Sequence, residues 1–185
     1  SEEVKKFDII DNNHPKLNYY SLFSPKPFIF HLYGASNKIQ EINVKLSILL
    51  CKRKISRILA ISHSVTYQVN NAINKIPIKV IYLGVDTKYF NTNLEKKFVK
   101  GNPQLLFVGV LYPHKNVNLL IDSIHDLLKK FPNTHLQIVG NGSEFLNLKQ
   151  KIKNEKLESN VELLGNIEKE ELRDRYASCD VYVTA

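Results

Sequence analysis

A short apolar run recurs three times in the second half of this chain and ends each time at a glycine. The runs are residues 104–108, 135–139 and 161–164, and the glycines are Gly109, Gly140 and Gly165. Longer stretches between them, such as residues 117–131, carry apolar residues at helical spacing. Strands that alternate with helices in this way predict a parallel sheet with helices on both faces.

The three glycines mark the carboxyl ends of the predicted strands. Parallel strands bring these ends to one edge of the sheet, and ligands of such sheets bind beyond that edge. Glycine has no side chain, so it lets another backbone or a ligand approach closely. The pattern therefore predicts a backbone-lined crevice at Gly109, Gly140 and Gly165.

The first half carries a weaker version of the same pattern. Apolar runs at residues 7–10, 27–32, 58–61 and 78–82 predict strands, the first of them followed by a polar turn. Residues 40–57 have the apolar spacing of a helix. The predicted fold class is therefore α/β, with two Rossmann-like parallel-sheet halves, each of them incomplete.

A polar segment separates the two halves. Residues 91–103 are rich in charged and polar side chains and contain Gly101 and Pro103, which predicts an interdomain linker. We expect residues 1–90 to form the C-terminal part of one Rossmann-like domain, and residues 104–185 to form the N-terminal part of a second.

Composition narrows the class of protein. Hydrophobic residues make up 43% of the 185 residues and charged residues 24%, which is typical of a globular protein. No apolar run reaches the ~18 residues of a transmembrane helix, and the first residues lack the apolar stretch of a signal peptide. Cys51 and Cys179 show no CxxC spacing and predict reduced thiols. We expect a cytoplasmic protein, with membrane association left open.

Five segments of the second half are similar to sequence patterns of one known family. The segments are Ile81–Phe90, Leu106–Asn116, Leu136–Gly142, Val161–Gly165 and Tyr176–Val183, and the patterns are IPNGVD…F, VGRLxxxKG, LxIVGxG, VxFLG and ADVFV. The chain thus resembles the retaining, family-4-type (group 1) glycosyltransferases with the two-domain GT-B architecture. Their order and spacing together make the resemblance specific.

Shorter segments of the first half are similar to the same family. They are Ile9–Pro15, Phe28–Gly34 and Leu59–Ser62. The sequence differs from the family patterns in two respects. Val110 stands where the family has Arg, and the sequence ends at Ala185, before the family's acidic EGFG…E segment. The resemblance therefore implies an interior fragment of such an enzyme, and we expect this fragment to be inactive on its own.

The resemblance implies transfer of a hexose from a UDP- or GDP-sugar, without metal or other cofactor. It assigns Lys115 to the diphosphate, Gly109 and the Gly140–Asn141–Gly142 turn to the nucleotide sugar, and Gly165–Asn166–Ile167 to the base. Lys115 precedes a predicted helix whose N-terminus favours negative charge. For Lys115 the alternative is a solvated surface side chain. For the glycines it is a tight turn that needs a positive φ.

Two histidines are candidates on the acceptor side. His31 ends a predicted buried strand, and the resemblance implies a catalytic role near the transferred sugar or the acceptor. His14 is a weaker candidate for the same side of the site. A single histidine at a strand end is also commonly a hydrogen-bonded structural residue, so both readings stay open.

The net charge of +8 predicts an anionic partner. The nucleotide-sugar donor fits this charge, with a sugar, lipid-linked or protein acceptor. Basic residues within 40–57 leave a peripheral membrane contact open. Nucleic acid does not fit, because the basic residues are dispersed and no aromatic-plus-basic motif accompanies them. The alternative functions are a non-catalytic nucleotide-sugar or sugar-phosphate binding module and a GT-B-type epimerase.

Overall fold

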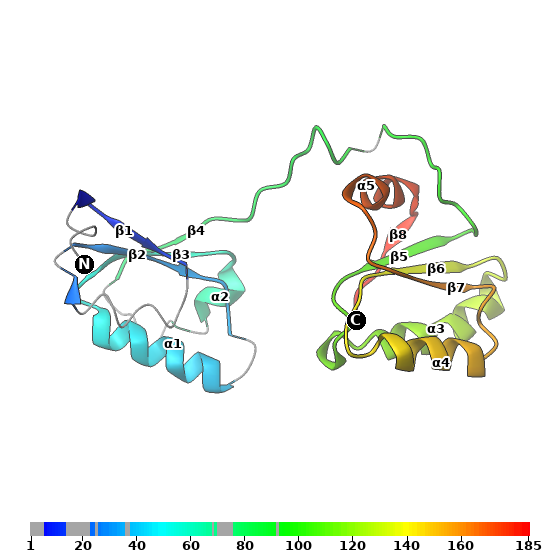
Figure 1. Cartoon of the computed structure of the whole chain (residues 1–185), viewed down its shortest axis with the longest axis horizontal. Coiled ribbons are helices and arrows are strands. Elements are labelled where there is room, and N and C mark those ends of the chain that lie inside the picture. The colour runs from blue at the N-terminus through cyan, green and yellow to red at the C-terminus, as the bar shows by residue number, and fades with distance from the viewer. Residues whose placement is uncertain are drawn as a thin grey trace. The chain divides into compact units, whose positions relative to one another are not determined.

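A computed structural model shows two compact α/β units, residues Ser1–Gly84 and Val85–Ala185 (Figure 1). The structure describes residues 6–13, 23–24, 26–35, 38–67, 69, 76–91 and 93–185.

The first unit contains a four-stranded sheet in which all described strands are parallel. The strand order is β1-β2-β3-β4, and α1 lies along one face of the sheet (Figure 1). The elements are β1 (Ile10–Asn12), β2 (Phe28–Leu32), α1 (Lys38–Cys51), β3 (Ile55–Ala60), α2 (His63–Tyr67) and β4 (Ile78–Val80).

Buried and partly exposed residues alternate along β2, and this pattern defines the two faces of the sheet. Phe28, Phe30 and Leu32 are buried, and Phe30 and Leu32 pack in a cluster with Val44 and Ile48 of α1. Successive side chains of a strand point to opposite faces. The intervening residues of β2, including His31, therefore lie on the face away from α1.

Two boundaries in this unit differ from the sequence prediction. The helix ends at Cys51, and Ile55–Ala60 is a strand, because Ile55 is buried in the core and Lys54 O accepts a hydrogen bond from Phe28 N. β1 begins at Ile10 and continues into residues predicted as a turn, because Asn12 is buried beside Phe30.

The second unit contains another four-stranded parallel sheet, with the order β7-β6-β5-β8. Helices α3 and α4 cover one face and α5 the other (Figure 1). The elements are β5 (Gln104–Val108), η4 (Pro113–Lys115), α3 (Val117–Lys130), β6 (His135–Val139), α4 (Phe145–Asn154), β7 (Val161–Gly165), α5 (Lys169–Ser178) and β8 (Val181–Tyr182). The prediction of two parallel-sheet α/β halves is confirmed.

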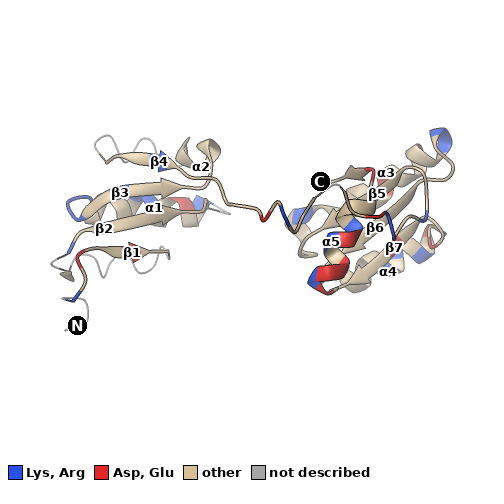
Figure 2. Ribbon diagram, turned by 90° about the horizontal axis from the view of Figure 1, so that it is seen from above, with Lys and Arg blue, Asp and Glu red and all other residues tan. Residues whose placement is uncertain are grey.

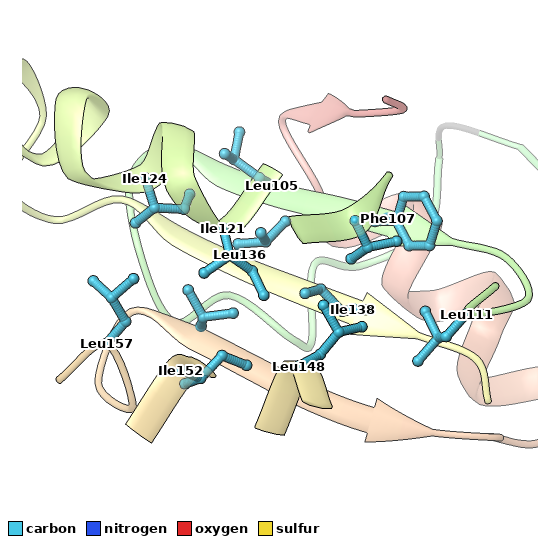
Figure 3. Packing of buried hydrophobic residues seen from close by; sticks show 12 residues of the cluster. Leu105, Phe107, Leu111, Ile121, Ile124, Leu136, Ile138, Leu148, Ile152 and Leu157 are labelled. Atoms are coloured by element: carbon cyan, nitrogen blue, oxygen red, sulfur yellow. The ribbon is translucent and has the colours of Figure 1, made fainter. Parts of the chain in front are cut away.

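A continuous apolar core lies between this sheet and helices α3 and α4. Ile121 and Ile124 of α3, Ile138 of β6 and Leu148 of α4 are each at most 1% exposed, and they pack together in one cluster (Figure 3). β6 is buried at all five positions, as expected for a central parallel strand covered on both faces. This core holds the strand ends in a fixed register.

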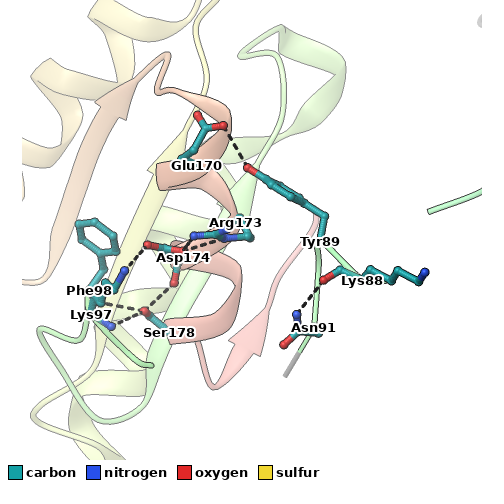
Figure 4. A network of polar contacts seen from close by, with 9 residues as sticks. All are labelled: Lys88, Tyr89, Asn91, Lys97, Phe98, Glu170, Arg173, Asp174 and Ser178. Atoms are coloured by element: carbon teal, nitrogen blue, oxygen red, sulfur yellow. Dashed lines mark hydrogen bonds and ion pairs between the residues drawn. The ribbon is translucent and has the colours of Figure 1, made fainter. Parts of the chain in front are cut away.

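The polar segment predicted as a linker contacts the second unit. The division between the units falls after Gly84, earlier than residues 91–103. Lys97 N and Phe98 N donate hydrogen bonds to Ser178 Oγ, and the Lys97 ammonium lies 2.8 Å from an Asp174 carboxylate oxygen (Figure 4). We call residues 93–100 the strap, because they run along α5 without forming a helix or strand.

Candidate functional site

The three glycine turns predicted from the sequence meet at the carboxyl edge of the second sheet. Gly109 N donates to Val139 O at 3.0 Å, and Gly140 N donates to Gly165 O at 2.8 Å. Leu111 N donates to the carbonyl of Asn141 at 2.9 Å. The backbone segments after β5, β6 and β7 therefore form one hydrogen-bonded rim.

Two glycines of this rim are required by contacts inside the protein. Gly140 has φ +132°, and a Cβ built on it would lie 1.9 Å from Gly109 O. A Cβ on Gly142 would lie 2.4 Å from Leu111 O. Close backbone approach thus accounts for both glycines without a ligand. Their proposed contact with a nucleotide sugar stays a prediction.

The side chain of Asn141 also has a local contact. Its Oδ1 accepts a hydrogen bond from Gly142 N at 2.8 Å, which stabilises the turn that leads into α4. After β7, Gly165 has φ +70° and Asn166 is exposed. Gly165, Asn166 and Ile167 follow the same sheet edge as Gly140, so the structure brings these sequence candidates together.

Lys115 lies in the turn that joins this edge to α3. Pro113–Lys115 form a short 3-10 helix, and Asn116 in the left-handed region (φ 53°) separates it from Val117. Lys115 is exposed, and its ammonium has no ion pair with any residue that the structure describes. A free cation before a helix N-terminus can bind an anion.

The order of the strands places a topological switch point between β5 and β8. The chain proceeds outward from β5 to β6 and β7, and then returns through α5 to β8 on the other side of β5. Ligands of doubly wound sheets bind at such points. Tyr182 Oη donates to Val108 O there, and Val110 is 49% exposed. Tyr182 received no role in the sequence analysis, because a tyrosine in a strand has no distinctive motif.

In the first unit the structure gives His31 a partner that the sequence analysis missed. His31 Nε2 lies 2.7 Å from Asp11 Oδ1, in a contact without the geometry of a hydrogen bond. The ring also stacks on Tyr33 with centroids 6.2 Å apart. A carboxylate next to an imidazole is an arrangement that also occurs in general-base sites. His14 lies outside the described residues.

The described residues contain no group of three or more His, Cys, Asp and Glu side chains placed to hold a metal ion. Among the helices of the part that the structure describes, none has the length and apolar content to cross a membrane.

The fold and the rim together define the class of protein. A doubly wound parallel sheet with glycine turns at its carboxyl edge is typical of nucleotide-binding α/β domains. A family model described as "Glycosyl transferases group 1" matches residues 90–185, just over half of the chain. The chain therefore belongs to the group 1 glycosyl transferases.

Two solved structures have a similar fold. Anabaena HepE in complex with UDP aligns with 98% of this chain and 54% of its own, at 22% identity and a TM-score of 0.78. An S. aureus TarM mutant in complex with Fondaparinux, alpha-GlcNAc-glycerol and UDP aligns with 95% of this chain and 36% of its own, at 18% identity and a TM-score of 0.70.

Among curated proteins, the chain is similar to the phosphatidylinositol N-acetylglucosaminyltransferase GPI3 subunit of Saccharomyces cerevisiae. The identity is 24% over 161 residues, which are 83% of this chain and 35% of the yeast protein. The chain thus spans about a third of the length of this relative.

Proposed function

We propose that this chain is part of a retaining, metal-independent glycosyltransferase that transfers a hexose from a UDP- or GDP-sugar. The observation that carries the proposal is the rim of glycine turns, which lies within the 96 residues that match the family (residues 90–185). The rim lies at the sheet edge where nucleotides bind in related folds. Lys115 stands beside it as an exposed cation.

In this proposal Lys115 acts on the leaving diphosphate. Breaking the glycosidic bond to the nucleotide leaves negative charge on the diphosphate oxygens, and a fixed cation stabilises that charge as it develops. The N-terminus of α3, which begins at Val117, adds a favourable backbone dipole at the same place. The glycine turns bring backbone close to the nucleotide, and Gly165–Ile167 hold the base.

The comparisons support one donor and one acceptor class over the others. HepE and TarM were crystallised with UDP, which favours UDP over GDP as the nucleotide. The name of the yeast relative favours N-acetylglucosamine as the sugar and an inositol phospholipid as the acceptor. His31, which lies beside Asp11, is the candidate to contact the acceptor hydroxyl or the transferred sugar.

A non-catalytic nucleotide-sugar binding module is the second candidate. Val110 favours it, because an exposed valine at the end of β5 supplies no charge where the family has Arg. Loss of one such donor reduces transition-state stabilisation by about 3 kcal/mol in other enzymes. Such a module would bind the nucleotide sugar without catalysing transfer of the sugar.

Titration calorimetry with UDP and GDP tests the site on this chain. We expect weak UDP binding that Lys115→Ala abolishes. Lys130→Ala is the matched control, because Lys130 is an exposed lysine at the opposite end of α3. Tight binding that Lys115→Ala leaves unchanged would show that the diphosphate is bound elsewhere.

Transfer is tested on the full-length gene product with labelled UDP-N-acetylglucosamine and phosphatidylinositol. We expect a labelled lipid product that Lys115→Ala reduces by at least about 100-fold, in line with the loss of one oxyanion donor. A protein that binds UDP but forms no product with any acceptor would support the binding-module alternative.

A further inference from the structure

Helix α1 has two apolar faces, and only one of them packs against other described residues of the first unit. Its inner face is buried against the sheet and consists of Val44, Ser47, Ile48 and Cys51. Its outer face consists of five large aliphatic side chains that are 45–73% exposed: Ile39, Ile42, Leu46, Leu49 and Leu50. We call these five residues the outer stripe.

The outer stripe is a continuous surface rather than a scatter of exposed residues. Ile39, Ile42, Leu46 and Leu49 follow one another at intervals of three or four positions, so they line one side of the helix. Contiguous apolar patches on a protein surface commonly mark contacts with another protein or with a membrane. The charges around the stripe distinguish these two partners.

The segment of the chain that carries the outer stripe is basic. Residues 38–57 contain six Lys and Arg residues and a single acid, Glu41, which forms an ion pair with Lys45. Lys52 and Arg53 are exposed in the turn that directly follows Leu49, Leu50 and Cys51. This turn between α1 and β3 is coloured blue in Figure 2. Neither side chain has an ion pair within the described parts of the chain.

We propose that the outer stripe and the basic turn at Lys52 and Arg53 bind an anionic lipid surface. The aliphatic side chains enter the boundary between headgroups and acyl chains, while the cations contact the anionic headgroups. Binding of this kind grows with the apolar area buried and with attraction to anionic lipid. The inference rests on this surface alone and does not depend on the proposed glycosyl transfer.

A second copy of the chain fits the same surface poorly. A symmetric dimer would place identical patches against each other. The cations of α1 and of the basic turn would then lie near the same cations of the partner, and Glu41 is already paired with Lys45. Like charges brought together oppose association. An anionic membrane offers the opposite charge along the whole patch.

Vesicle flotation with the 185-residue chain tests the proposal. We expect binding to phosphatidylcholine vesicles that contain phosphatidylserine, and little binding to phosphatidylcholine alone. Leu46→Glu with Leu49→Glu should weaken binding by at least about tenfold, because two inserted leucines are lost. Lys52→Glu with Arg53→Glu should weaken it by at least about 25-fold, since each cation near an anionic surface strengthens binding about fivefold.

Matched variants in the second unit separate this surface from net charge and general hydrophobicity. Lys149→Glu with Lys153→Glu changes the net charge by the same amount, and Leu119→Glu with Leu146→Glu alters two exposed leucines. We expect both to bind vesicles within about threefold of the wild type, a limit set by long-range charge effects. Circular dichroism and melting temperature check that every variant is folded.

The proposal is overturned if the wild type does not bind anionic vesicles, or if the second-unit variants lose as much binding as the α1 variants. It is also overturned if analytical ultracentrifugation shows a dimer that Leu46→Glu with Leu49→Glu dissociates while vesicles are not bound. UDP binding measured on the same variants should be unchanged. A failure of the nucleotide proposal is thereby distinguished from a failure of this one.

Discussion

The carbonyl oxygen of Gly109 lies where a side chain of Gly140 would begin: a Cβ on Gly140 would be 1.9 Å from that oxygen. This contact joins the turns after β5 and β6, which also share the hydrogen bond from Gly109 N to Val139 O. The contact between these two turns therefore depends on the absence of a side chain at Gly140.

Gly140→Ala should reduce the free energy of unfolding of the second unit by about 3 kcal/mol or more. The substitution strains a residue at φ +132° and drives two backbones apart. Urea denaturation followed by circular dichroism measures the loss. Gly84→Ala is the control, because a Cβ there meets nothing within 4 Å, and it should change stability by at most about 0.5 kcal/mol. Equal effects of the two substitutions would contradict the close contact.

The same contact shows why part of the site could not be predicted from the sequence. A glycine at a strand end indicates that another group approaches the backbone closely. It does not distinguish a ligand from a neighbouring loop. In the structure the backbone of Gly109 occupies the space beside Gly140, and the backbone of Leu111 occupies the space beside Gly142. These internal contacts are sufficient to account for both glycines.

Local periodicity predicted the second unit well. Residues 117–131 were predicted as a helix and α3 is Val117–Lys130, because its apolar face is regular and its end is marked by polar residues. In the first unit Ile55 fits a helical spacing as well as a strand, so the helix was predicted to continue to residue 57. Ile55 instead begins a strand, because its side chain is buried in the core of the first unit.

Contacts between distant residues were missed for a different reason. Lys97 and Ser178 are 81 residues apart, and a polar segment such as the strap has the composition of a free linker. Asp11 and His31 are brought together only by the parallel pairing of β1 and β2. No local pattern in the sequence contains either relationship.

The strap provides a second prediction. Ser178 is fully buried, and its hydroxyl accepts hydrogen bonds from Lys97 N at 3.0 Å and Phe98 N at 3.1 Å (Figure 4). Ser178→Ala should destabilise the second unit by about 1–3 kcal/mol, because two donors lose their acceptor.

Amide hydrogen exchange should localise this effect to the strap, with faster exchange at residues 96–98 than in the wild type. Ser123→Ala removes an exposed hydroxyl that bonds to its own helix at Leu120 O, and it serves as the control. If both substitutions leave exchange in the strap unchanged, the strap is held by its ion pairs instead.

A third prediction concerns pH. Burial lowers the pKa of His135 below its usual value of 6.5, and Gln104 Nε2 lies 3.3 Å from His135 Nδ1, where the neutral ring can act as acceptor. A lowered folded-state pKa means that the unfolded chain binds the proton more tightly. Stability should therefore be complete above about pH 6.5 and should decrease as the pH falls below that value.

NMR titration of the histidine ring protons measures this directly, and we expect a pKa for His135 below 6.5. His135→Gln should remove the part of the pH dependence of unfolding that lies just below pH 6.5. A measured pKa at or above 6.5, or an unchanged pH profile in the variant, would contradict the buried neutral ring.

The exposed valine at the end of β5 leads to a prediction of improved binding. Val110→Arg introduces a cation at the position where the family has Arg, beside Gly109 and the switch point. A hydrogen bond to a charged group contributes about 1.5–3 kcal/mol, so UDP affinity should rise about tenfold or more. Calorimetry measures the change. Leu119→Arg adds the same charge at a 58% exposed position of α3, and it should have an effect of less than about threefold, as expected for a screened surface charge. Equal gains in both variants would mean that net charge, rather than a placed guanidinium, attracts the nucleotide.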